Sequence, residues 1–142
     1  MKFVVLLVML LVSSVLNAAD KVFGNVVVSE VTSIYDADTF RVNIQGWPDI
    51  IGKRMSVRVL GVDAPEIRGK CPSEKKAARL AKQYTVEALR SAKKIELRDM
   101  QRGKYFRILA NVYIDGKNLA EGLIVAKHGR AYHGGKRSGW CG

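Results

Sequence analysis

Two acidic clusters are conspicuous because the chain is poor in acids, with 13 Asp and Glu against 24 Lys and Arg. They are Asp36-Ala37-Asp38 and Asp63-Ala64-Pro65-Glu66, each at the end of a predicted strand, and Asp115 follows a third strand. Pro65 fixes a turn that can hold Asp63 and Glu66 near one point. Carboxylate oxygens are the ligands that Ca²⁺ and Mg²⁺ prefer, so the clusters predict a metal site. Taken singly, each acid more often serves a turn, a cap or a solvated loop.

Two arginines accompany these acids. Arg58 lies inside an apolar strand, and Arg107 begins another strand directly after Lys104-Tyr105-Phe106. Hydrolysis of a phosphodiester needs a carboxylate-held metal, a base that activates water, and guanidinium groups that stabilise the charged phosphate. The chain has all three, although a surface ion pair is the plainer interpretation of each arginine. Strict alternation places Arg58 and Asp63 on opposite faces, and a bulge at Gly61 would correct this.

The elements that position these residues are short strands with one long helix among them. Strands are predicted over residues 26–35, 39–44, 54–60, 94–98 and 107–114, because β-branched or alternating residues fill them. A helix is predicted over residues 73–92, with a buried stripe of Ala77, Leu80, Ala81, Tyr84, Ala88 and Leu89. A shorter helix covers residues 119–128 behind Asn118 as its N-cap. The fold class is therefore mainly β with helices (α+β), and a five-stranded OB-fold barrel is the leading candidate.

The length of 142 residues allows one domain, and 48% apolar residues with three Pro exclude a low-complexity chain. Residues 1–19 have a basic start at Lys2, an apolar run and small residues before Asp20, which predicts a signal peptide cleaved after Ala19. The expected domains are thus a signal peptide, residues 1–19, and one folded domain, residues 20–142. We expect a secreted or periplasmic monomer without stable membrane association.

The predicted export indicates how the two cysteines are used. Cys71 and Cys141 lack the paired spacing of a zinc site, so a disulfide is predicted in an oxidising compartment. Removal of residues 1–19, which carry one basic residue and no acid, leaves the net charge at +10 of the full +11. Such a basic surface attracts polyanions such as DNA and RNA.

Three blocks of sequence closely resemble the staphylococcal nuclease (thermonuclease) family: residues 36–39, residues 58–66 and residues 105–107. The resemblance spans about residues 26–132, and the ending Gly134 to Cys141 is similar to that of the branch secreted by Gram-negative bacteria. It implies an OB-fold barrel with three helices, the third near the tail. It also implies Ca²⁺-dependent hydrolysis of DNA and RNA that leaves 3′-phosphate ends.

The resemblance also implies a role for each matching residue. Asp38 and Asp63 would hold the metal through carboxylates and Ala64 through its backbone carbonyl, with Asp36 behind them. Glu66 would be the general base, Arg58 and Arg107 would bind the phosphate, and Tyr105 would lie near the nucleotide. Phe106 replaces a glycine of the family, and the segment at residues 127–132 is shorter. Because clustered carboxylates repel each other, Asp38→Ala is expected to stabilise the metal-free protein.

Two other functional classes fit parts of this pattern. A catalytically inactive OB-fold module that only binds nucleic acid would share the basic charge, but it would not need Asp38, Glu66, Arg58 and Arg107 together. A membrane-active protein would need a strongly amphipathic cationic helix, and residues 73–92 contain too much alanine for that.

Overall fold

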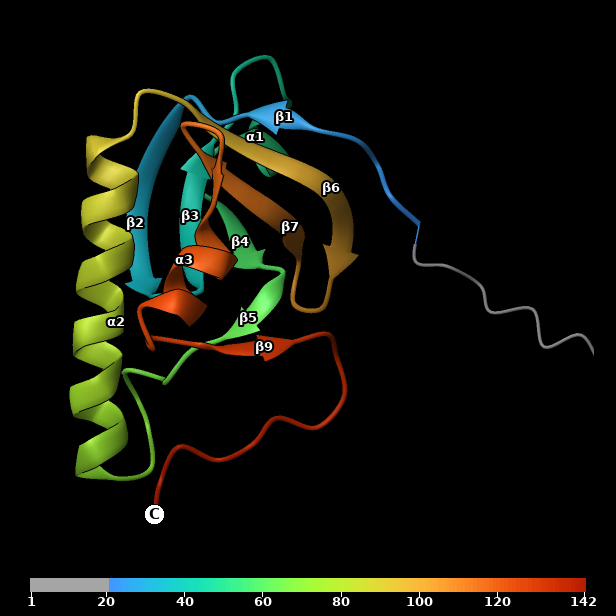
Figure 1. Cartoon of the computed structure of the whole chain (residues 1–142). Coiled ribbons are helices and arrows are strands. Elements are labelled where there is room, and N and C mark those ends of the chain that lie inside the picture. The colour runs from blue at the N-terminus through green and yellow to red at the C-terminus, as the bar shows by residue number, and fades with distance from the viewer. Residues whose placement is uncertain (1–20) are drawn as a thin grey trace, which may run out of the picture.

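The computed structural model describes residues 21–142, so the predicted signal peptide, residues 1–19, lies outside the described residues. The chain is a mixed α+β protein in which a curled, half-barrel sheet carries three helices (Figure 1). The strands are β1 Val26–Val27, β2 Glu30–Asp36, β3 Thr39–Asn43, β4 Met55–Val59, β5 Gly61–Asp63, β6 Ile95–Gly103, β7 Arg107–Ile114, β8 Lys117–Asn118 and β9 Arg130–Tyr132. The helices are α1 Asp49–Gly52, α2 Pro72–Ser91 and α3 Leu119–Val125.

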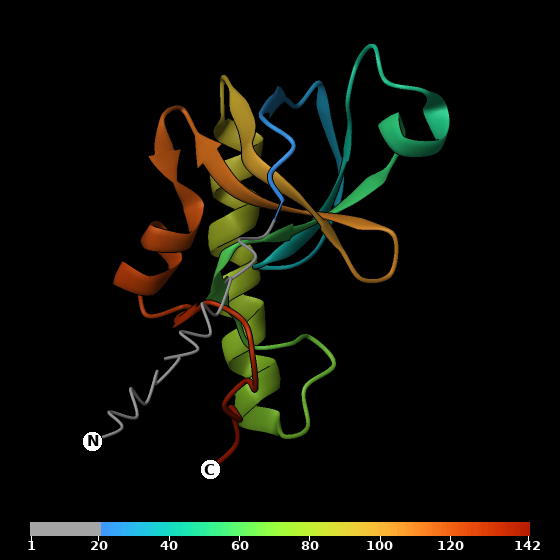
Figure 2. The same cartoon turned by 90° about the vertical axis from the view of Figure 1, so that its right-hand side faces the viewer.

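The main sheet has the order β1-β6-β7-β4-β3-β2, with β8 paired to β7. All its pairs are antiparallel except β4 and β7, which run parallel with Arg58 opposite Leu109. A second, two-stranded sheet joins β5 to β9, where Asp63 lies opposite Arg130. The β2–β3 turn, β5 and the β6–β7 loop consequently lie toward the same end of the curled sheet (Figures 1 and 2).

The inner face of the sheet forms the core. Alternate residues of the strands are fully buried there together with Leu123 of α3, and the largest are Phe40, Val42, Val57, Leu97 and Val112. The other residues of β3, β4 and β7 point away from this core. This period of two determines which polar side chains can form a site on the outer face.

Helix α2 lies alongside β2 and fixes the position of the β2–β3 turn (Figure 1). Its buried Thr85 donates a hydrogen bond from Oγ1 to the carbonyl oxygen of Ala37 at 2.8 Å. Arg90 of the same helix donates a hydrogen bond from Nη1 to the carbonyl oxygen of Val31 at 2.7 Å. The helix therefore holds the backbone of the first acidic cluster in place.

Four predicted strands are confirmed as β3, β4, β6 and β7, and the two predicted helices as α2 and α3, although α3 already ends at Val125. The strand predicted over residues 26–35 is divided into β1, which pairs with β6, and β2, which pairs with β3. The N-cap is also confirmed, because Asn118 Oδ1 accepts a hydrogen bond from the Glu121 N–H at 3.2 Å. The buried stripe of α2 was wrong in part: Leu80 is half exposed, whereas Glu74, Ala78 and Thr85 are buried. The β2 strand, against which α2 packs, selects a face that the apolar pattern alone does not identify.

The third helix is not near the tail. It is the single turn α1 in the loop between β3 and β4, a segment that reads as a turn because of Gly46 and Pro48. The last part of the chain instead forms β9, whose short Arg130–Tyr132 segment needs β5 as a partner to be a strand. No helix within residues 21–142 is long and apolar enough to cross a membrane.

Candidate active site

Arg58 and Arg107 lie on the outer face of two adjacent parallel strands. Val57 and Val59 of β4 point into the core, as do Ile108 and Ala110 of β7, so the residues between them point outward. Arg107 lies opposite Ser56, two residues before Arg58 along β4. Both arginines therefore belong to one face, although no ion pair or hydrogen bond of the described residues joins them.

Arg58 links the two acidic clusters. Its Nη1 lies 2.8 Å from Asp38 Oδ2, and its Nη2 lies 3.5 Å from Asp63 Oδ1. Nη1 also donates hydrogen bonds to the carbonyl oxygens of Val59 and Val62, at 3.3 and 3.1 Å. Because this side chain is only 11% exposed, both of its ion pairs are shielded from water.

The interruption between strands β4 and β5 makes the contact between Arg58 and Asp63 possible. Only Leu60 separates β4 from β5, and Gly61, the first residue of β5, has a φ of +87°, a conformation that residues with a Cβ rarely adopt. The turn reverses the alternation, so Asp63 faces Arg58 instead of lying on the opposite face. The bulge that the sequence required for this contact is therefore present as a break between two strands.

The first cluster places Asp36 and Asp38 on either side of a tight turn. Asp36 ends β2 and pairs with Thr39 of β3, and both acids are about 5% exposed or less. Burial, followed by the charge of Asp38, raises the pKa of Asp36 to about 8, and its Oδ1 has no hydrogen-bond partner among the described residues. An orphaned buried carboxyl oxygen beside a second acid is an environment suited to a cation.

The second cluster contacts the first through the backbone. The Ala64 N–H donates to Asp38 Oδ2 at 2.9 Å, and Thr39 Oγ1 donates to Asp38 Oδ1 at 3.1 Å. The sequence-predicted ligands Asp38, Asp63 and Ala64 are thus neighbours that offer only oxygen donors. This donor set fits Ca²⁺ or Mg²⁺. Within residues 21–142 no three carboxylates converge within 4.8 Å, because the guanidinium of Arg58 lies between Asp38 and Asp63.

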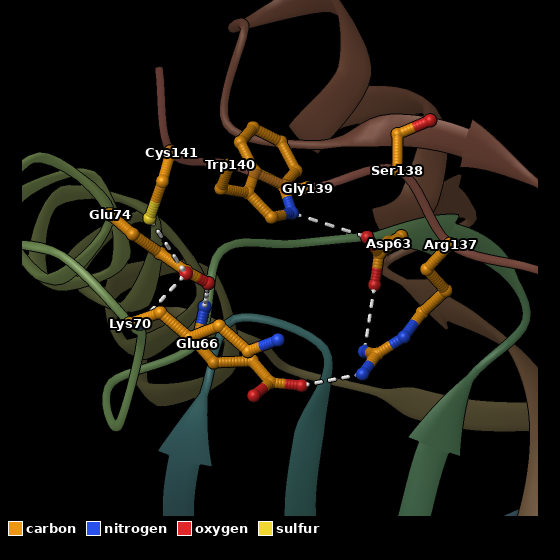
Figure 3. Close-up of a pocket in the computed structure, with 9 residues that line it drawn as sticks. All are labelled: Asp63, Glu66, Lys70, Glu74, Arg137, Ser138, Gly139, Trp140 and Cys141. Carbon is orange, nitrogen blue, oxygen red and sulfur yellow. Dashed lines mark hydrogen bonds and ion pairs between the residues drawn. The ribbon is translucent and has the colours of Figure 1, made fainter.

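Glu66 lies in the loop after β5, and its side chain is half exposed. Its backbone N–H donates to Oε2 of the buried Glu74 in the first turn of α2, at 3.2 Å. Its own Oε1 lies 2.7 Å from Nη2 of Arg137, whose Nη1 lies 3.1 Å from Asp63 Oδ1 (Figure 3). The hydrogen bond to Glu66, more than the charge of Asp63, raises the pKa of Arg137 above its usual range.

Arg107 differs from the other two arginines in having no acidic partner. None of the ion pairs within residues 21–142 includes it, and its buried Nε lacks a hydrogen-bond partner. Its guanidinium carbon lies 5.9 Å from the ring centre of Tyr105, which is 88% exposed on the β6–β7 loop. Phe106 has a φ of +52°, so it keeps a backbone conformation that favours glycine.

Asp115 is not part of this site. Its carboxylate accepts hydrogen bonds from the backbone N–H groups of Lys93 and Lys94, at 3.1 and 2.8 Å for Oδ1. These bonds anchor the chain just before β6, so Asp115 has the turn-stabilising role that isolated acids often have.

The C-terminal tail, residues 133–142, supplies site residues that the sequence did not identify. Trp140 Nε1 donates to Asp63 Oδ2 at 3.2 Å, so both oxygens of Asp63 accept from the tail (Figure 3). The predicted disulfide between Cys71 and Cys141 is confirmed. This disulfide was the available signal, because Cys71 is five residues after Glu66 and its partner must bring Arg137 and Trp140 close to the same loop.

A curled sheet with buried acids and arginines on its outer face defines an OB-like domain in which these residues form the candidate site. Comparison with known families gives a narrower result: the model of the staphylococcal nuclease homologues matches residues 56–137. The chain belongs to this family. The matched region contains Arg58, Asp63, Glu66 and Arg107, and it extends to Arg137 in the tail. The family implies nuclease-like function on nucleic-acid substrates.

Proposed function

We propose that this protein is a secreted or periplasmic, Ca²⁺-dependent nuclease that hydrolyses DNA and RNA with little sequence specificity and leaves 3′-phosphate ends. The observation that carries the proposal is the contact of Arg58 with both acidic clusters, together with an Arg107 that has no acidic partner within residues 21–142. The Cys71–Cys141 disulfide is typical of an oxidising compartment outside the cytoplasm. The signal-peptide pattern of residues 1–19 supports export.

In this proposal each residue has a separate task. Asp38, Asp63 and the Ala64 carbonyl would hold Ca²⁺, with Asp36 behind them. Bound Ca²⁺ would supply positive charge that neutralises the phosphate. Glu66 takes a proton from the attacking water through the oxygen that Arg137 leaves free. Water adds to phosphorus as it loses its proton to Glu66, and the bond between phosphorus and the 5′ oxygen breaks. The 5′ oxygen takes a proton from solvent and leaves as a hydroxyl, and Glu66 returns its proton to solvent.

The arginines stabilise the charge on the phosphate as this bond changes. Arg107 carries no competing carboxylate, so its planar fork is available to two phosphate oxygens. Tyr105 is exposed next to it and can contact the neighbouring nucleotide. The basic surface contacts the phosphate backbone without reading bases, so binding should weaken steeply as salt increases.

The decisive experiment is cleavage of plasmid DNA and of a folded RNA with Ca²⁺, with Mg²⁺ and with excess chelator. We expect both substrates to be cut with Ca²⁺ and neither with chelator, and the new ends to carry 3′-phosphate. Full activity in chelator would remove the metal from the mechanism. Tight nucleic-acid binding without any cleavage would instead favour the alternative, a catalytically inactive OB-fold binding module.

A further inference from the structure

The tail reaches the candidate active site from the far end of the sequence and is fastened there at several points. Trp140 is hydrogen-bonded to Asp63, and Cys141 is bonded covalently to Cys71. Arg130 of β9 lies over the Trp140 ring at 3.8 Å and donates from Nη1 to the Gly139 carbonyl at 2.8 Å. Arg137 lies within the segment that these contacts fasten, between Arg130 and the anchored residues 139–141.

Arg137 makes two contacts, and both are to side chains of the site. One nitrogen binds Asp63 and the other binds Glu66, at 3.1 and 2.7 Å. A planar guanidinium with two engaged nitrogens fixes both the position and the orientation of the carboxylates that it bridges. A nearby cation of the tail, Lys136, is exposed and forms no ion pair among the described residues. The contact is therefore specific to position 137.

The consequence for Glu66 is geometric. A half-exposed glutamate on a loop has several rotamers, and restricting such a side chain to one of them costs conformational entropy. Arg137 holds Oε1 and leaves Oε2 without a partner among residues 21–142. Glu74 holds the backbone N–H of the same residue. Main chain and side chain of Glu66 are thus both fixed, and Glu66 lines a hollow of about 330 Å³ between loop and tail (Figure 3).

We propose that Arg137 is a positioning residue of the active site, which the disulfide-anchored tail delivers in order to hold Glu66 beside Asp63. The inference rests on the proposed function, since it assigns Arg137 a task only if Glu66 is the base. The two contacts of Arg137 place it against Asp63 and Glu66, so the task assigned to it is to orient these carboxylates and not to bind the phosphate. It acts through Glu66, so its loss should matter only while Glu66 can accept a proton.

The test is a double-mutant cycle with Glu66→Gln, Arg137→Ala and both together, and with Lys136→Ala as the matched loss of charge. Turnover at saturating Ca²⁺, Kd for an oligonucleotide and Kd for Ca²⁺ by calorimetry are measured for each. We expect Arg137→Ala to lower kcat about 10- to 100-fold, since misplacement of a catalytic group has effects of this size. The Kd for the oligonucleotide should stay within about twofold of that of Lys136→Ala, and saturating Ca²⁺ removes any change in the Kd for Ca²⁺ from the comparison of kcat. In the Glu66→Gln background, Arg137→Ala should change kcat less than about twofold.

The other outcomes separate the inference from the proposed function. If Glu66→Gln turns over like the wild type, both the base assignment and the positioning role are wrong. If Glu66→Gln is impaired but Arg137→Ala is not, only the positioning role is wrong. An equal loss from Arg137→Ala in both backgrounds would show a direct action on substrate. Tighter Ca²⁺ binding together with faster turnover would show that the tail obstructs the site instead of organising it.

Discussion

Arg58 and Arg107 occupy equivalent outward positions on neighbouring strands, yet their surroundings are opposite. Arg58 is 11% exposed, and two carboxylates and two carbonyl oxygens surround its guanidinium. Arg107 has no acidic partner within residues 21–142, and its buried Nε is left without a hydrogen bond. The two-residue period of the strands places both side chains on the outer face. Only the loops around them make their surroundings different.

Because of this difference, we expect the stability of the fold to depend mainly on Arg58 and the rate of the reaction mainly on Arg107. Removal of Arg58 leaves buried carboxylates without their counter-charge, which should cost the folded state free energy. Removal of Arg107 leaves nothing unpaired, so its cost should fall on the reaction. The same substitution to methionine at both positions, which keeps an unbranched apolar stem and removes the charged guanidinium, makes the comparison measurable.

Arg58→Met should have the largest effect on stability. Breaking a buried ion pair by removing one partner typically costs about 3–5 kcal/mol, and here Asp38 and Asp63 would both lose a cation. Arg137 still forms an ion pair with Asp63, so the destabilisation should come mainly from Asp38, which is left without a cation. Urea denaturation without Ca²⁺ measures the change in the free energy of unfolding. A change below about 1 kcal/mol would mean that water already screens the pair.

Arg107→Met should have the next largest effect, on turnover and not on folding. Loss of one preorganised donor to a developing negative charge typically costs about 10²–10³-fold in kcat, or about 2.7–4 kcal/mol. The free energy of unfolding should change by no more than about 1 kcal/mol, because no acid is orphaned. Single-turnover cleavage and oligonucleotide binding at fixed low salt separate the effect on turnover from the effect on substrate affinity. If Arg107→Met unfolds as readily as Arg58→Met, the contrast between the two arginines is wrong.

The fold was predictable where the signal is local. Alternation located the five main strands, and Asn118 marked the start of α3. The short strands β5 and β9 were not predictable, because Gly61–Asp63 and Arg130–Tyr132 become strands only by pairing with each other. Gly61 was recognised as the position that could bring Arg58 and Asp63 together, since a glycine is needed where the backbone φ is positive.

The candidate site was predictable in its acids and in two arginines, but not in its tail. Residues 133–142 are rich in glycine and have no periodicity, so no local pattern indicates that Arg137 and Trp140 contact Asp63. The disulfide gives the missing constraint, but only after Cys71 and Glu66 are seen as parts of one loop. Contacts across more than 70 residues follow from that bond and not from propensity.

Asp38→Ala sharpens the comparison further, because it removes one partner of Arg58 and leaves the other. The sequence led us to expect stabilisation of the metal-free protein through relief of repulsion between carboxylates. The contacts of Asp38 reverse that expectation: it accepts from Arg58, from the Ala64 N–H and from Thr39. Repulsion is small in comparison, because the raised pKa of Asp36, about 8, keeps that acid mostly protonated at neutral pH.

We therefore expect Asp38→Ala to lower the free energy of unfolding by about 1–3 kcal/mol without Ca²⁺, the range for leaving a buried donor unsatisfied. The loss of stability should be smaller than that of Arg58→Met. In Asp38→Ala, Arg58 still has Asp63 as an ion-pair partner at 3.5 Å, whereas Arg58→Met leaves Asp38 without a cation. Asp38→Asn is the matched control, since its side-chain carbonyl can still accept from Ala64 and should recover part of the loss. Urea denaturation of the three variants at pH 7 gives the order directly. A more stable Asp38→Ala would show that repulsion within the acidic clusters outweighs their hydrogen bonds, and that Arg58 holds the site together less firmly than its contacts indicate.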